Sequence, residues 1–254
     1  MKPVFLLGSV INVSEGTFNY MDHSRSSQSA VERAKQTFLS LNSIFCRVPN
    51  AKIYIIEGSL NLPETLLISS GISHYLDVYD VELVKLVDVD EDACVELNTH
   101  RNKSYCESLL YSIFLRHYKE DLKNYDMIIK MSGRYSLTVT CDIGQMPDKN
   151  KVYFKRELYF PNPNNEQWAY PDLLIPGQEL TDAKWTTSIL FAFGVNRLND
   201  LQDFFNFIIS NTKNRDTCVE QLIQYWSWMN KINHEEIGWM LCGWNGGDDV
   251  FWYQ

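Results

Sequence analysis

The stretch that decides the fold is Tyr125–Tyr135, YDMIIKMSGRY. Its residues 127–131 are apolar except for Lys130, and a Ser-Gly pair follows them directly. This pattern predicts a buried strand that ends in a tight turn. The stretch brings two cations, Lys130 and Arg134, to the carboxyl end of the strand, which is the edge where ligands bind in open α/β sheets. We therefore expect an anion site here. The alternative is that Lys130 reaches solvent and Arg134 pairs with a surface carboxylate.

The composition is that of an acidic globular protein. The 254 residues are 45% hydrophobic, which is enough for a sizeable core, and the formal net charge is −9. Because nucleic acids and anionic membranes attract basic surfaces, we expect neither as a partner, and an anion must be bound by a local group of cations. The six cysteines show no C-x-x-C pair, and no apolar run reaches the roughly 18 residues of a membrane span. We expect a cytoplasmic protein with reduced thiols and no transmembrane segment.

The first part of the chain predicts a β-α-β unit. Residues 4–10 form a continuous apolar run typical of a buried parallel strand, and Ser29 and Glu32 form a capping box that opens a helix. Residues 51–58 predict the second strand, which ends with Glu57 and a glycine. An acid at this place commonly accepts a hydrogen bond from a ribose or a base, although an exposed strand-end carboxylate explains Glu57 equally well.

A second helix start lies shortly before the central strand. Ser104 and Glu107 form another capping box, and the apolar residues after them recur at helical spacing. Asn102 and Lys103 then lie just outside the helix, where unpaired backbone N–H groups favour an anion. The turns at Lys103 and Arg134 flank one helix–strand unit, so we expect them to converge on one phosphate-bearing ligand.

An acidic run offers a different site. The sequence DVDED at residues 88–92 follows a region, residues 75–89, that predicts one or two strands. An Asp-x-Asp pair after a strand can hold a divalent cation that bridges a diphosphate. Dense acidic runs are more often solvated surface, so we expect no firm cofactor and keep Asp88 and Asp90 as fallback ligands for Mn²⁺ or Mg²⁺.

The second half of the chain is less regular. It predicts strands near residues 151–156 and 186–195, separated by a loop rich in Pro, Asn and aromatic residues. In this loop, Trp168, Tyr170 and Trp185 could stack on a sugar ring. The alternative, which is the commoner one for aromatic residues in such loops, is that they anchor the loop to the core.

Several enzyme classes lack their motifs here. The chain has no G-x-x-x-x-G-K-[ST] loop for nucleoside triphosphates, no G-x-G-x-x-G after the first strand and no G-x-S-x-G elbow. Its five histidines show no zinc-ligand spacing. What remains is a β-α-β start, an acid after the second strand and local cations at the carboxyl edge of the sheet. This combination suits a ligand built on a nucleoside diphosphate.

Five short motifs carry a resemblance to a known enzyme family. They are R-x-x-Q-T at residues 33–37, L-x-S-I at 41–44, P-x-A-K-I-x-x-x-E-G-S at 49–59, N-K-S-x-x-E at 102–107 and K-x-S-G-R-Y at 130–135. With them, the chain resembles a poorly characterised group of GT-A-type glycosyltransferases over about its first 140 residues.

The resemblance implies a fold and a division of the chain. It implies one GT-A-like (Rossmann-like) α/β domain over residues 1–254, with a mostly parallel central sheet flanked by helices. Residues 1–140 would bind the nucleotide sugar, and the mixed loop-rich and helical residues 141–254 would bind the acceptor. Such an enzyme moves a sugar from a nucleotide-diphosphate donor to a glycan, lipid-linked or other hydroxyl acceptor.

The resemblance and the residue patterns together indicate which residues form the site. Typical GT-A enzymes carry an Asp-x-Asp metal motif at the end of a central strand, where this chain has KMSGR at residues 130–134. Lys130 and Arg134 would then replace the metal in stabilising the leaving diphosphate. The residues expected to bind the donor are Gly8, Arg33, Gln36, Thr37, Glu57, Asn102, Lys103, Ser132, Gly133 and Tyr135. Those expected to bind the acceptor are Trp168, Tyr170, Asp182 and Trp185.

An inverting transfer further needs a carboxylate base from the second half of the chain. Glu220 is our candidate, ahead of Asp182 and Glu235, although the spacing of Thr217 and Glu220 also predicts a capping box. Two other functions stay open. One is a non-catalytic carbohydrate- or nucleotide-binding protein of the same fold. The other is a sugar-phosphate nucleotidyltransferase, which needs a glycine-rich basic loop after the first strand, where this chain continues with apolar residues.

Overall fold

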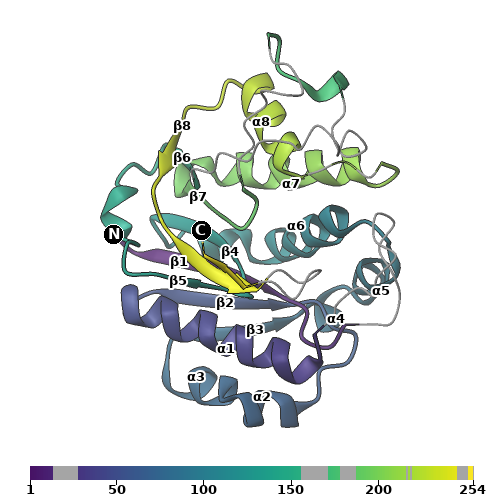
Figure 1. Ribbon diagram of the computed structural model, residues 1–254, viewed down its shortest axis with the longest axis vertical. Coiled ribbons are helices and arrows are strands. Elements are labelled where there is room, and N and C mark those ends of the chain that lie inside the picture. Colours follow the sequence, from purple (N-terminus) through teal and green to yellow (C-terminus); the bar gives the residue numbers. More distant parts are fainter. Residues whose placement is uncertain are drawn as a thin grey trace.

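The computed structural model describes residues 1–13, 28–155, 171–177, 187–215, 217, 219–244 and 251–253. Its centre is a seven-stranded sheet with helices on both faces (Figure 1). The predicted fold class, α/β with a mostly parallel central sheet flanked by helices, is confirmed. Within the described ranges, every helix is either too short or too polar to cross a bilayer.

The central sheet is parallel except at one strand. It comprises β1 (Pro3–Ser9), β2 (Lys52–Glu57), β3 (Val81–Lys85), β4 (Met127–Ser132), β6 (Val152–Lys155), β7 (Leu190–Gly194) and β8 (His234–Ile237). The spatial order is β3-β2-β1-β4-β7-β6-β8. Strands β1 to β4 run parallel, and β7 runs antiparallel to both of its neighbours. A smaller sheet is formed by β5 (Tyr135–Leu137), β9 (Leu241–Trp244) and β10 (Phe251–Tyr253).

Helices cover both faces of the sheet. One face carries α1 (Ala30–Arg47), α2 (Glu64–Ser70) and α3 (Ile72–Val78), as Figure 1 shows. On the other side lie α4 (Leu86–Val89), α5 (Glu91–Thr99), α6 (Lys103–Leu122), α7 (Leu198–Thr212) and α8 (Val219–Met229). Short 3₁₀ helices occur at Ile143–Gln145, Pro171–Leu173 and Val195–Arg197.

The apolar run of β1 is continuous because both of its faces are buried. Phe5 and Leu7 belong to the hydrophobic cluster on the α1 side, and Val4 and Leu6 belong to the cluster on the α6 side. All four side chains are fully buried. This double burial is the expected property of a parallel strand covered by helices on two faces.

The predicted helix starts were right for α1 and wrong for α6. The Ser29–Glu32 capping box is present. In α6 the N-cap is Asn102 and not Ser104, because the Asn102 Oδ1 accepts a hydrogen bond from the Tyr105 N–H at 2.9 Å. Asn is as good an N-cap as Ser, so spacing alone did not separate the two.

The strand prediction for residues 75–89 was only partly right. Residues 81–85 form β3, but helices lie before and after it. Gly71 has φ of 84°, which lets it end α2 and start α3 within one residue. The pattern of alternating polarity did not reveal α3.

Candidate functional site

The candidate site lies where β1 and β4 end side by side. The chain continues from β1 to β2 on one side and reaches β4 on the other, so the carboxyl ends of β1 and β4 form the topological switch point at which α/β sheets bind ligands. Gly133 donates its N–H to the Gly8 carbonyl at 2.8 Å. A Cβ on Gly133 would lie 2.9 Å from that oxygen, so the turn after β4 approaches β1 as closely as only glycine allows.

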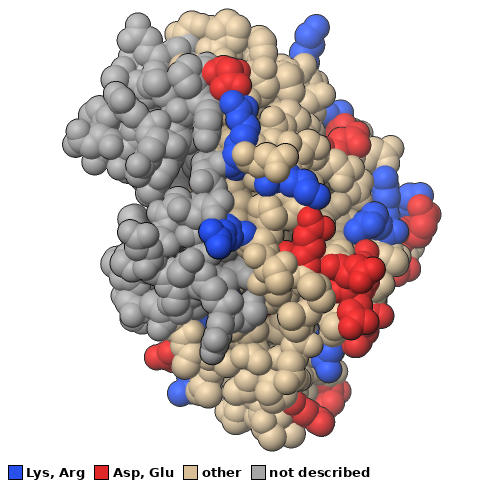
Figure 2. All heavy atoms as spheres, turned by 90° about the vertical axis from the view of Figure 1, so that its right-hand side faces the viewer, with Lys and Arg blue, Asp and Glu red and all other residues tan. Residues whose placement is uncertain are grey.

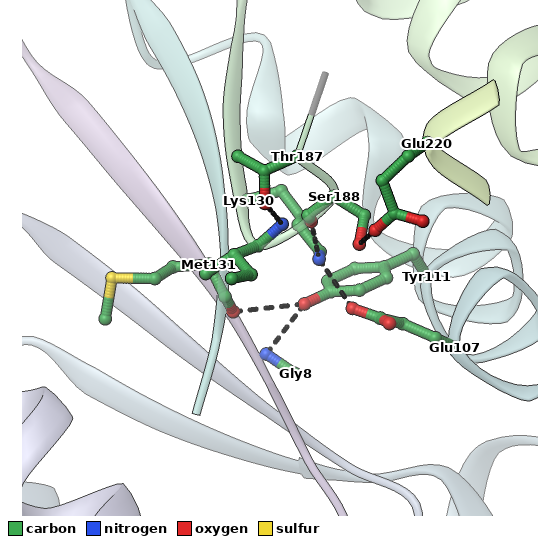
Figure 3. Close-up of polar contacts among 9 residues, drawn as sticks. Gly8, Glu107, Tyr111, Lys130, Met131, Thr187, Ser188 and Glu220 are labelled. Atoms are coloured by element: carbon green, nitrogen blue, oxygen red, sulfur yellow. Dashed lines mark hydrogen bonds and ion pairs between the residues drawn. The ribbon is translucent and has the colours of Figure 1, made fainter. Parts of the chain in front are cut away.

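Tyr111 of α6 closes the space behind this turn. Its hydroxyl accepts a hydrogen bond from the Gly8 N–H at 2.9 Å and donates one to the Met131 carbonyl at 3.1 Å (Figure 3). A Cβ on Gly8 would lie 2.8 Å from the Tyr111 Cζ. Gly8 thus lets one tyrosine tie the ends of two parallel strands together. Gly8 and Gly133, both expected in the donor site, set the backbone geometry there.

Three cations converge at this edge from three elements. Arg33 comes from α1, Lys103 from the first turn of α6 and Arg134 from the turn after β4, and each is half-buried. They interact electrostatically with one another. The Arg33 Nε donates to the Val10 carbonyl at 2.5 Å, whereas Lys103 and Arg134 form no hydrogen bond or ion pair in the described ranges. Lys103 and Arg134 thus lie close enough to interact, and their convergence on one phosphate-bearing ligand stays a prediction.

Burial and mutual repulsion lower the pKa values of two of these cations. Burial and the neighbouring Arg134 lower the pKa of Lys103 to about 8, and the nearby Glu107 and Glu220 offset only part of this. Burial and Arg134 also lower the pKa of Arg33, which Glu57 partly offsets. The site therefore favours the entry of an anion, which would relieve the repulsion.

Lys130 is not one of the cations that line this edge. Its side chain is 2% exposed, and its Nζ lies 2.5 Å from the Glu107 Oε1 (Figure 3). It also donates a hydrogen bond to the Ser188 carbonyl. Burial alone would raise the pKa of Glu107, but the pair with Lys130, with Lys103 and Arg134 nearby, lowers it overall. Lys130 is thus a buried, paired cation beneath the site, so the alternative in which it reaches solvent is wrong.

Glu220 reaches the same region from the first turn of α8. The Ser188 Oγ donates to its Oε1 at 2.7 Å, and Lys103 interacts with it electrostatically. The capping box expected for Glu220 is incomplete, because the buried Thr217 Oγ1 has no hydrogen-bond partner. The carboxylate proposed as a base therefore lies beside the cations.

Glu57 is fully buried, so its interpretation as an exposed carboxylate was wrong. Its Oε1 accepts hydrogen bonds from the Ile11 N–H at 3.0 Å and the Ser59 N–H at 2.9 Å, and one from the Ser59 hydroxyl. Its Oε2 has no hydrogen-bond partner. Glu57 therefore anchors the chain after β1 and retains one acceptor oxygen.

The buried face of α1 adds two further expected residues. The Thr37 Oγ1 lies 3.2 Å from the Ser9 Oγ, and the Gln36 side chain is buried with no partner for its Oε1. One turn later, the Ser40 Oγ donates to the Tyr135 carbonyl at 2.6 Å. This contact places α1 directly against the turn that carries Ser132, Gly133 and Arg134, so its polar face lines the candidate site.

Both polar atoms of the Asn102 side-chain amide form hydrogen bonds within the fold. Besides capping α6, its Nδ2 donates to the Arg215 carbonyl at 2.7 Å. It lines a surface hollow together with Arg101, Lys213 and Arg215. Lys213 and Arg215 form ion pairs with acids there, so this hollow is partly neutralised. Figure 2 shows the face that lies on the right-hand side of Figure 1. Basic side chains cross the middle of this face, and acidic side chains gather just below them.

The fallback metal ligands have other roles in the described structure. Asp90 caps α5 by accepting from the Ala93 N–H at 3.0 Å and pairs with Arg116 at 3.4 Å. Asp88 lies in the short helix α4. Among the described residues, no three His, Cys, Asp or Glu side chains gather as a metal site would require. The acceptor candidates Trp168, Tyr170, Asp182 and Trp185 lie outside the described residues.

Comparison with known proteins gives similarity at the level of structure and none at the level of sequence. No protein-family model and no curated protein matches the sequence. The chain is similar to a crystal structure of the galactosyltransferase LgtC in complex with donor and acceptor sugar analogues, with a TM-score of 0.49 and 10% sequence identity. The alignment covers 89% of this chain and 70% of that chain.

Three residues of the network were missed by sequence reasoning. Glu107 was assigned to a capping box, although it closes the motif N-K-S-x-x-E and pairs with the first residue of K-x-S-G-R-Y. Tyr111 follows Glu107 by one helical turn, so the two share a face, and this spacing was a usable signal. Ser188 lies in a segment without a motif and gave no signal.

Proposed function

We propose that the chain is a GT-A-type glycosyltransferase that moves a sugar from a nucleotide-diphosphate donor to a hydroxyl of a glycan, lipid-linked or other acceptor. The observation that carries this proposal is the convergence of Arg33, Lys103 and Arg134 at the switch point of the sheet. Two of them, Lys103 and Arg134, are half-buried and have no ion-pair partner in the described part of the chain.

The charge of the site favours a diphosphate over a neutral sugar. A chain with net charge −9 keeps three cations close together at one edge, at the cost of lowered pKa values for Lys103 and Arg33. A diphosphate offers several oxygens to several donors at once, and arginine binds phosphate oxygens in a fixed fork geometry. The first turn of α6 adds backbone N–H groups that favour the same kind of ligand.

The proposed reaction is a displacement at the sugar carbon. The acceptor hydroxyl gives its proton to the Glu220 carboxylate, a bond forms between its oxygen and the sugar carbon, and the bond from that carbon to the diphosphate oxygen breaks. The nucleoside diphosphate leaves with the electron pair. Lys103 and Arg134, with Arg33 beside them, stabilise the negative charge that develops on it.

In this proposal the cations stabilise the leaving diphosphate, as a divalent metal does in typical GT-A enzymes. Lys130 contributes indirectly, since it pairs with Glu107 beneath the site and so reduces the attraction of this acid for the half-buried Lys103 and Arg134. Glu57 and Gln36 each keep a buried acceptor oxygen without a partner, which suits the hydroxyl or N–H donors of a nucleoside. Trp168, Tyr170, Asp182 and Trp185 remain proposed contacts of the acceptor.

A ligand panel tests the proposal. The chain is mixed with UDP-, GDP-, CDP- and dTDP-sugars, each with EDTA or with Mn²⁺, and its melting temperature is measured. Release of nucleoside diphosphate is followed in the same samples, with water or simple sugars as acceptor. We expect one donor class to raise the melting temperature in EDTA and to release its nucleoside diphosphate. Binding without release supports the non-catalytic alternative, and no binding by any donor refutes both.

A further inference from the structure

The polar contacts around Ser188 form a continuous chain from α6 to α8. The Glu107 Oε1 is 2.5 Å from the Lys130 Nζ, and that ammonium donates to the Ser188 carbonyl. The hydroxyl of the same serine donates to the Glu220 Oε1 at 2.7 Å. Figure 3 shows Ser188 between Lys130 and Glu220, in contact with both. One residue thus links the buried ion pair to the carboxylate beside the cation cluster.

The backbone of Ser188 is fixed from two further directions. Its predecessor Thr187 accepts a hydrogen bond from the Ile189 N–H at 3.2 Å, and the Ile189 carbonyl accepts from the Ser132 N–H at 3.1 Å. Because β7 runs antiparallel to β4, the residues before β7 lie at the same edge as the end of β4. The Ser188 hydroxyl therefore projects from a fixed point beside the Ser132–Arg134 turn.

The Ser188 hydroxyl is a hydrogen-bond partner of the Glu220 carboxylate. Glu220 stands in the first turn of α8, and the predicted capping bond from Thr217 is not formed. A side chain with several rotatable bonds loses rotamer freedom only when a partner holds it. The hydrogen bond from Ser188 sets the direction of the carboxylate, and Lys130 in turn sets the position of Ser188.

We propose that Ser188 is a positioning residue, held by the Glu107–Lys130 ion pair, that orients the Glu220 carboxylate for removal of the acceptor proton. The inference rests on the proposed function, because it assigns Glu220 as the base. Ser188 itself gains and loses no proton in the step. The proton moves from the acceptor hydroxyl to Glu220 while the sugar–diphosphate bond breaks, and the serine O–H stays a donor to Oε1 throughout.

The proposal separates Ser188 from the donor-binding cations. Since the serine acts only through Glu220, its loss lowers the rate of the chemical step and leaves donor affinity unchanged. A misplaced base typically lowers the rate by about tenfold to a hundredfold. A serine that merely supported the fold would instead change donor binding and turnover together, or stability alone.

The test is a double-mutant cycle. Nucleoside diphosphate release from the UDP-, GDP-, CDP- and dTDP-sugars is measured for the wild type, Ser188→Ala, Ser188→Thr, Glu220→Gln and the Ser188→Ala/Glu220→Gln double variant. Ser210→Ala is the matched control, since Ser210 is exposed and donates only within its own helix, to the Asn206 carbonyl at 2.9 Å.

The expected result is a kcat for Ser188→Ala at least about tenfold below that of the wild type, with the donor KM within about twofold. Ser188→Thr should recover most of the rate, and Ser188→Ala should cost nothing further once Glu220 is Gln. The inference is overturned if the wild type turns over a donor and Ser188→Ala has the same kcat. It is also overturned if the kcat losses of Ser188→Ala and Glu220→Gln multiply in the double variant. Either result leaves the proposed function intact. Absence of turnover with every donor overturns both.

Discussion

Replacing Lys103 by methionine should stabilise the empty protein while weakening its binding of anions. Burial beside Arg134 lowers the pKa of Lys103 to about 8, against about 10.4 in an unfolded chain. Between these values the unfolded chain binds more protons, so the charge costs folding free energy below pH 8, and this cost disappears as pH rises toward 10.4. The full gap corresponds to about 3 kcal/mol at most, which partial exposure reduces to about 1–2 kcal/mol. We expect Lys103→Met to raise the melting temperature at pH 7 by about 2–4 °C per kcal/mol.

The same lysine makes anion binding depend on pH. A bound anion stabilises the ammonium, so binding takes up a proton above pH 8, and affinity should fall as pH rises. From pH 7 to pH 9 the affinity of the wild type for inorganic pyrophosphate should fall about tenfold relative to that of Lys103→Met. Pyrophosphate itself also loses protons over this pH range, but this affects the wild type and Lys103→Met equally and cancels in the ratio of their affinities.

Isothermal titration at pH 7, 8 and 9 measures both effects when combined with thermal unfolding of the empty protein. Lys123→Met is the control, because Lys123 is exposed at the other end of α6 and pairs with Glu120. A melting temperature for Lys103→Met at or below that of the wild type at pH 7, or a ratio of affinities that stays constant with pH, would refute the assignment of Lys103 to the cation cluster.

Further predictions concern the parts around the cluster. Glu107→Gln leaves the buried Lys130 without its carboxylate partner. The free energy of unfolding, measured in urea, should therefore fall by about 3–5 kcal/mol. A loss under about 1 kcal/mol would show that the pair is not buried in solution. Gly8→Ala brings a Cβ against Tyr111 and should cost about 1–3 kcal/mol, whereas Gly238→Ala, whose Cβ meets nothing within 4 Å, should be neutral. EDTA should leave donor turnover unchanged, and a loss that Mn²⁺ restores would instead place the diphosphate on a metal.

The sequence predicts much of the fold because local patterns decide it. The apolar runs at residues 4–10, 51–58 and 127–131 become β1, β2 and β4 with ends shifted by at most one residue. These runs are recognisable because a strand buried on both faces has few polar positions. Helix α3 was missed because Gly71 joins it to α2 through one left-handed residue, which no hydrophobic period reveals.

The candidate site was predictable only in part, because its charges pair over long distances in sequence. The approach of Lys103 to Arg134 follows from the helix–strand order, and it was predicted. Glu107 lies 23 residues from Lys130, and Ser188 lies 58 residues from it. Which of several acids pairs with a buried lysine depends on side-chain direction in the folded chain, so Lys130 could not be separated in advance from the cations of the site.

The most direct test of the account is the binding of a nucleotide sugar by Arg134→Ala in EDTA. Arg134 contributes a half-buried cation with no ion pair in the described part of the chain, so its removal should leave the melting temperature of the empty protein unchanged or higher. Isothermal titration with the donor that stabilises the wild type should then show affinity reduced at least about tenfold, as expected for the loss of a charge-assisted hydrogen bond. Equal affinity of wild type and Arg134→Ala would contradict the central claim that these cations bind the diphosphate.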